Sequence, residues 1–73
     1  MSEYITKKER FGLYLCYLRK QAHLTQMDVA DKLEMSQSCI SRWEHGESIP
    51  AKKYLYRLAH LYHVSKAKIM CEI

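Results

Sequence analysis

The stretch of sequence that decides the fold runs from residue 24 to residue 50 and reads LTQMDVADKLEMSQSCISRWEHGESIP. Two short helices are predicted inside it, because each begins after a hydroxyl side chain that can accept hydrogen bonds from unpaired helix amides. Thr25 precedes the first helix, with Asp28 three residues later as in a capping box, and Ser36 precedes the second. Gly46 stands where the second helix ends, a position that favours left-handed backbone.

Helices are also predicted on both sides of this stretch. Upstream, Thr6 and Glu9 form another capping box, and apolar residues continue at helical spacing to about Ala22. Downstream, Pro50 is expected to begin a fourth helix and Ser65 to cap a short last one. No segment has the alternating pattern of a strand. The sequence therefore predicts an all-α fold, a compact bundle of about five short helices.

Length and charge narrow the classes of function. Seventy-three residues are enough for one domain, so a single domain is predicted over residues 1–73. Twelve Lys and Arg residues against eight Asp and Glu residues give a net charge of +4, which suits a polyanionic partner. So short a chain is not expected to build a deep catalytic pocket, and it shows neither paired carboxylates nor a Gly-rich phosphate loop. An enzyme is not expected.

Cysteine and histidine usage favours neither a metal nor a cofactor. The three cysteines are far apart and odd in number, which is typical of reduced thiols in the cytoplasm. His60 and His63 could share a helix face, with Cys71 as a further ligand, but zinc sites need three or four ligands at recurring spacings. Residues 1–4 lack an apolar signal core, and no apolar run could span a bilayer. A cytoplasmic protein without metal, cofactor or membrane contact is predicted.

The second helix of the deciding stretch has one apolar and one polar face. Ile40 and Trp43 are expected to turn inward, whereas the opposite side displays hydrogen-bonding groups. These are Gln37, Ser38, Ser41, Arg42 and His45. A helix with such a face suits the major groove of DNA, where side chains read base edges. An ordinary solvated face remains an equally good interpretation of these residues alone.

The order and spacing of residues 24–50 closely resemble the helix-turn-helix pattern of phage repressors and Cro proteins, within the xenobiotic-response-element (XRE) family of bacterial regulators. The matching positions are Leu24-Thr25-Gln26, Val29-Ala30, Leu33, Met35-Ser36-Gln37-Ser38, Ile40, Ser41, Trp43-Glu44, Gly46 and Pro50. Further matches are Gly12, Leu15, Leu18 and Arg19 upstream, and Leu58, Ala59, Tyr62, Val64 and Ser65 downstream. The resemblance covers about residues 10–70 and implies a lambda-repressor-like DNA-binding domain, with its motif core at about residues 26–45.

The resemblance implies a sequence-specific regulator of transcription from a bacterium, phage or mobile element, a repressor that binds double-stranded DNA. It would act as a homodimer on a palindromic operator, through a recognition helix at about residues 37–45. Base contacts are implied for Gln37, Ser38, Ser41 and Arg42, and phosphate contacts for Gln26, His45, Lys52 and Lys53. Gln26 would also hold the side chain of Gln37. Arg19 and Glu44 match an ion pair that joins the first and third helices in phage-repressor relatives.

Two positions depart from the family pattern. His23 and Glu34 stand where the family usually has Gly, and a non-Gly residue in left-handed geometry costs roughly 1 kcal/mol. A less regular turn between the two motif helices is therefore expected, within an unchanged fold.

The dimer interface is expected in the C-terminal part, which has more apolar side chains than one small core can hide. The candidates are Tyr54, Tyr56, Leu61, Tyr62, Ile69, Met70 and Ile73. Half of them could instead complete the core of the monomer. An alternative function for the same fold is an antitoxin or a restriction-modification controller, which would act partly through a protein partner. A second regulatory protein is therefore also considered as a partner.

Overall fold

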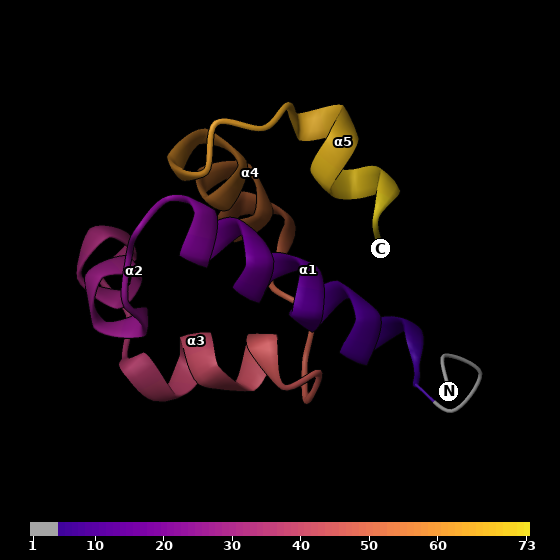
Figure 1. Cartoon of the computed structure of the whole chain (residues 1–73), viewed down its shortest axis with the longest axis horizontal. Coiled ribbons are helices and arrows are strands. Elements are labelled where there is room, and N and C mark those ends of the chain that lie inside the picture. Colours follow the sequence, from indigo (N-terminus) through magenta and orange to yellow (C-terminus); the bar gives the residue numbers. More distant parts are fainter. Residues whose placement is uncertain (1–4) are drawn as a thin grey trace.

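The computed structural model describes residues 5–73, so the prediction about residues 1–4 lies outside the described residues. The helices are α1 (Lys7–Gln21), α2 (Gln26–Leu33), α3 (Gln37–Glu44), α4 (Lys52–Leu61) and α5 (Lys66–Cys71). In Figure 1, α3 lies below α1, α4 and α5 lie above it, and α2 lies beside the end of α1. All regular structure within residues 5–73 is helical, which confirms the predicted fold class.

The core is built from side chains of all five helices. Its most deeply buried large side chains are Phe11, Leu15, Val29, Ile40, Leu58 and Ile69. Within a helix, buried residues such as Phe11 and Leu15 are four apart, because residues three or four apart share one face of a helix. Burial of these apolar groups is the main force that holds the five short helices together.

Two residues that were expected at a dimer surface belong to this core instead. Tyr62 is 7% exposed and Ile69 is fully buried, so almost none of their surface is left for contact with a partner. The reason is that α5 packs against α4 and its single buried residue closes the core there. Burial also raises the pKa of the Tyr62 hydroxyl above its ordinary value. Tyr54 packs on Trp43, with ring centroids 5.8 Å apart, so its ring is largely used within the monomer.

Side chains cap the starts of four helices. The Thr6 amide donates to the Glu9 carboxylate at 2.8 Å, and the Glu9 amide donates to the Thr6 hydroxyl at 3.0 Å. Thr25 and Asp28 form the same reciprocal pair at the start of α2. Serine hydroxyls cap α3 and α5. The predicted helix starts at these four places are therefore confirmed.

The Asp28 cap is expected to make stability depend on pH. The hydrogen bond from the Thr25 amide lowers the pKa of the Asp28 carboxyl below its ordinary value of 3.8. The charged Asp28 carboxylate therefore makes its full contribution to the free energy of unfolding above pH 3.8. This contribution is lost as pH falls through the lower pKa of the folded state. Asp28→Asn keeps one oxygen acceptor for the Thr25 amide and removes the negative charge. Urea unfolding should show the variant less stable at neutral pH and equal to the wild type in strong acid, whereas a constant difference would contradict this account.

The link between α3 and α4 differs partly from the prediction. Gly46 has the predicted left-handed backbone, with φ of 78°, and a Cβ there would lie 2.6 Å from Glu9 Cα. Pro50, however, does not begin the fourth helix. Its ring is buried and Ala51, with extended backbone, is the N-cap, so α4 begins at Lys52.

The turn between α2 and α3 is regular, contrary to expectation. Glu34 has φ of 57° and ψ of 45°, close to ideal left-handed geometry, and His23 and His63 have positive φ as well. The Met35 amide donates to the Ala30 carbonyl oxygen at 2.9 Å and closes the end of α2. This hydrogen bond helps to offset the cost of a left-handed non-glycine residue, so glycine is not required here.

Candidate nucleic-acid interface

The position of α3 is set by a close approach of its backbone to α1 at Gly12. A Cβ on Gly12 would lie 2.5 Å from the carbonyl oxygen of Glu44 and 2.6 Å from that of Trp43. No side chain fits in that space, so the absence of a Cβ lets the two helices pack at this distance. The C-terminal end of α3 is thereby held against α1, while Gln37 and Ser38 at its start are exposed to solvent.

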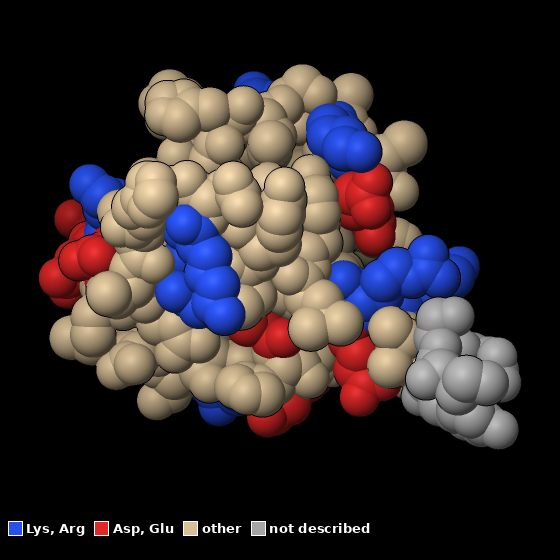
Figure 2. Space-filling view, in the orientation of Figure 1, with Lys and Arg blue, Asp and Glu red and all other residues tan. Residues whose placement is uncertain are grey.

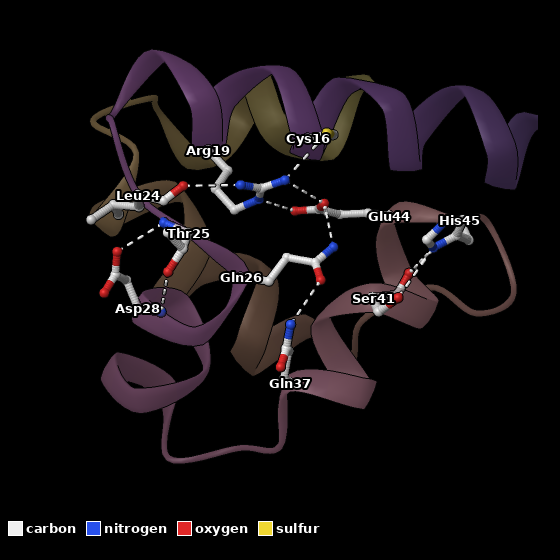
Figure 3. Close-up of polar contacts among 10 residues, drawn as sticks. All are labelled: Cys16, Arg19, Leu24, Thr25, Gln26, Asp28, Gln37, Ser41, Glu44 and His45. Atoms are coloured by element: carbon white, nitrogen blue, oxygen red, sulfur yellow. Dashed lines mark hydrogen bonds and ion pairs between the residues drawn. The ribbon is translucent and has the colours of Figure 1, made fainter.

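A partly buried ion pair joins the same two helices (Figure 3). Arg19 donates from Nε to Glu44 Oε2 at 2.8 Å and from Nη2 to Glu44 Oε1 at 3.1 Å. Arg19 Nη1 also donates to the Leu24 carbonyl oxygen at 2.9 Å. The two side chains are only 12% and 5% exposed, and the hydrogen bond to Glu44 raises the pKa of the Arg19 guanidinium. The structure thus brings together the two residues that the resemblance paired.

Hydrogen bonds connect this ion pair to the outer surface of α3 (Figure 3). Gln26 Nε2 donates to Glu44 Oε1 at 3.0 Å, and Gln37 Nε2 donates to Gln26 Oε1 over a longer 3.5 Å. An amide group has two hydrogens and a carbonyl oxygen, so Gln37 keeps its oxygen and one hydrogen for an external partner. The contact therefore orients the exposed Gln37 side chain and leaves most of its hydrogen-bonding capacity free.

The other residues expected to read bases lie on the same helix. Ser38 and Arg42 are exposed, whereas Ser41 is half-buried. His45 follows the helix, and its Nδ1 lies 2.7 Å from the Ser41 carbonyl oxygen and 3.2 Å from the Ser41 hydroxyl (Figure 3). Because a carbonyl oxygen only accepts, Nδ1 bears the hydrogen, and the neutral ring then has no hydrogen on Nε2.

Two lysines expected at phosphates open α4, and both are exposed. The ammonium group of Lys53 lies 5.1 Å from the centroid of the Tyr54 ring, within the range of a cation–π contact. Lys52 and Arg42 have no ion-pair partner within residues 5–73, where the ion pairs are Arg19–Glu44 and Lys68–Glu72. Their charges are therefore available to an anionic partner.

One exposed apolar pair was missed by the sequence analysis. Leu13 and Tyr17 lie one turn apart on α1 and are 59% and 58% exposed. Their positions could have revealed this, since both fall outside the helical spacing of the buried residues Phe11, Leu15 and Leu18. Figure 2 shows the molecule from the direction of Figure 1, and on this face basic and acidic groups are scattered and form no continuous basic stripe.

Metal ligands do not gather in the described part of the chain. Among residues 5–73, no three His, Cys, Asp or Glu side chains are grouped as a metal would require. Cys16, Cys39 and Cys71 are free thiols. Within the same residues, none of the helices has the length and apolar character needed to cross a membrane.

Both the sequence and the arrangement of the helices match known proteins. The sequence model of a family described as helix-turn-helix matches residues 17–69, most of the chain. The chain belongs to the XRE-type helix-turn-helix family. Within this family, α2 and α3 are the two motif helices, and α3 is the second of them.

Two relatives illustrate the family. The HTH-type transcriptional regulator DicA of Escherichia coli (strain K12) is 34% identical over 65 residues, which is 89% of this chain and 48% of the relative. The chain thus spans about half the length of that regulator. The crystal structure of the clp gene regulator ClgR from C. glutamicum matches with a TM-score of 0.78 and 22% identity, covering 93% of this chain and 88% of that one. This second likeness shows the same fold.

Proposed function

We propose that the chain binds specific DNA sequences and represses transcription as a homodimer on a palindromic operator. The observation that carries the proposal is the arrangement of α3. Its inner side is fixed to α1 at Gly12 and by the Arg19–Glu44 ion pair, and its outer side displays polar groups to solvent. Base readout requires donors and acceptors held in fixed positions, and the attachment of α3 to α1 supports the proposal because it fixes the backbone that carries them.

Base readout is assigned to the first turns of α3. The Gln37 amide can form paired hydrogen bonds with adenine, and the Arg42 guanidinium can form them with guanine. Gln37 is oriented by Gln26, whose second amide hydrogen remains available for a phosphate oxygen. Ser38 and Ser41 offer hydroxyl groups beside these residues and would contact either bases or the backbone.

Phosphate contacts are assigned to residues that border the recognition helix. Lys52 and Lys53 are exposed in the first turn of α4, and His45 lies at the end of α3. Such contacts do not read sequence, but they fix the position of the protein on the duplex. They also make binding sensitive to salt, with a slope of log affinity on log salt of about −0.9 for each neutralised phosphate.

A homodimer is proposed because one module makes few base contacts. In two-fold related dimers, half-sites lie about 34–36 Å apart, so that both recognition helices enter successive major grooves. With Tyr62 and Ile69 in the core, the candidates left at the C-terminal end are Met70, which is half-buried, and Ile73, which is 40% exposed. The other candidates, Tyr54, Tyr56 and Leu61, are half-buried.

The experiment that tests this function is selection of bound sites from random duplex DNA. The wild type should select an inverted repeat whose half-sites are about one helical turn apart. Gln37→Ala should lose base preference at one position in each half-site, because a paired amide–adenine contact is worth about 1–3 kcal/mol of discrimination. The salt dependence of binding should stay nearly unchanged for this variant, since Gln37 neutralises no phosphate.

Lys52→Ala is the matched control. It should weaken binding to all sequences alike and reduce the salt slope by about one per subunit, with base preference intact. If Gln37→Ala keeps the wild-type preference at every position, α3 does not read bases in the way proposed. Selection of a single, unrepeated half-site by one chain would refute the homodimer.

A further inference from the structure

A surface hollow of about 470 Å³ lies between α2, α4 and the start of α5. Its rim and walls include Lys32 of α2, Tyr56, Arg57, His60 and Leu61 of α4, and Lys66 of α5. None of the residues proposed to contact DNA lines it. The hollow is therefore separate from the proposed DNA-binding surface, and the proposed DNA contacts do not explain it.

The bottom of the hollow is apolar. Leu33 is only 4% exposed, and Leu61 and the ring of Tyr56 are half-buried beside it. The ammonium group of Lys66 lies 4.8 Å from the centroid of the Tyr56 ring, as in a cation–π contact. This contact holds a positive charge at the edge of an apolar surface, so an anionic group and an apolar group could bind side by side.

The charges around the hollow have one sign. Lys32, Arg57 and Lys66 are cationic and exposed, and no acidic side chain lines the hollow. Arg57 and Lys66 form no ion pair within residues 5–73, where the ion pairs involve other residues. Lys32 forms none either, although its charge acts on the Asp28 carboxyl one turn earlier on α2. Such a cluster repels itself and favours a partner that brings negative charge.

We propose that this hollow docks a short acidic segment of a partner protein. An apolar side chain of the segment would rest on Leu33 and Leu61, while its carboxylates would pair with Lys32, Arg57 and Lys66. A small molecule is a poorer match, because small-ligand sites usually enclose most of the ligand and this hollow lies open at the surface. An extended segment needs only charge complementarity and one anchor. The proposal does not rest on DNA binding, since the two surfaces share no residue.

The test measures binding of a fluorescently labelled peptide in which leucine is flanked by glutamates. Fluorescence anisotropy with the wild type should show saturable binding at low salt. The double variant Arg57→Glu, Lys66→Glu should weaken the Kd by about tenfold or more, because two attractive charges become repulsive. Both side chains are exposed, so the fold should be kept, which an unchanged circular dichroism melting curve would verify.

Matched controls separate docking from general attraction between charges. Lys8→Glu with Lys20→Glu makes the same change of charge on exposed residues of α1, outside the hollow, and should leave peptide binding nearly unchanged. A peptide with glutamine in place of glutamate should not bind, and one with serine in place of leucine should bind more weakly. Equal loss in both double variants would overturn the proposal. So would loss of duplex DNA affinity with a reduced salt slope in the hollow variant alone, which would make the hollow a phosphate contact.

Discussion

Glu44→Gln is expected to destabilise the protein by about 3–5 kcal/mol, because it leaves the Arg19 guanidinium without its carboxylate partner in a partly buried site. Arg19 is 12% exposed and Glu44 is 5% exposed, so water cannot replace the lost carboxylate well. Domains of this size have a total stability of only about 5–15 kcal/mol. Urea unfolding followed by circular dichroism should therefore show a large shift in midpoint, and the variant could be unfolded at body temperature.

A double-mutant cycle shows whether the loss comes from the ion pair. Arg19→Met and Glu44→Met should each be similarly destabilising, and the double variant Arg19→Met, Glu44→Met should lose clearly less than the sum of these two single losses. Recovery should be incomplete, because the Leu24 carbonyl oxygen and the Gln26 amide also lose partners. Additive losses would show that the two side chains do not interact. The exposed pair Lys68–Glu72 is the control, and Glu72→Gln should have a much smaller effect.

The same variant connects stability to DNA recognition. Gln26 donates to Glu44 and accepts from Gln37, so the ion pair supports the orientation of the residue proposed to read adenine. The network consists of few bonds, and its last contact, at 3.5 Å, is the weakest by geometry. Glu44→Gln is therefore expected to lose both stability and base preference. Gln37→Ala is expected to lose base preference without losing stability.

Much of the fold could be predicted because local chemistry fixes where helices begin. The capping boxes at Thr6 and Thr25 pair groups only three residues apart, so the sequence alone indicates them. The start of α4 lacks such a side-chain cap, and the helix begins at Lys52, two residues after the predicted start at Pro50. Proline permits a helix start but does not require one, and here its ring is buried.

The outer surfaces were harder to predict than the core. Counting apolar residues in the C-terminal part could not show that Tyr62 and Ile69 are needed to close the core, because that depends on how α5 packs against α4. The hollow at Arg57 and Lys66 was hard to predict for the same reason, since it lies between α2 and the helices α4 and α5, which are distant from α2 in the sequence. The spacing of residues along one helix is a local property, whereas a hollow between helices is not.

Gly12→Ala adds only one methyl group, but it is expected to lower the free energy of unfolding by about 3 kcal/mol or more. At an open position in a helix, replacing Gly by Ala should instead stabilise by up to about 1 kcal/mol. Here the added Cβ would lie 2.5 Å from the Glu44 carbonyl oxygen, and backbone atoms cannot move aside as a flexible side chain can. The helices α1 and α3 must separate, which would also disturb the Arg19–Glu44 ion pair.

Thermal and urea unfolding of Gly12→Ala measure this loss directly, with Lys20→Ala as a control on an exposed position of the same helix. The control should change stability little, since its side chain can be removed without altering the packing of α1 on α3. The damage at Gly12 should extend to function, because separation of the helices moves the outer face of α3 relative to Lys52 and Lys53, which are proposed to contact phosphates. At a temperature where the variant is still folded, affinity for the selected DNA site should fall. A stabilised variant would mean that α1 and α3 do not approach as closely as Gly12 indicates.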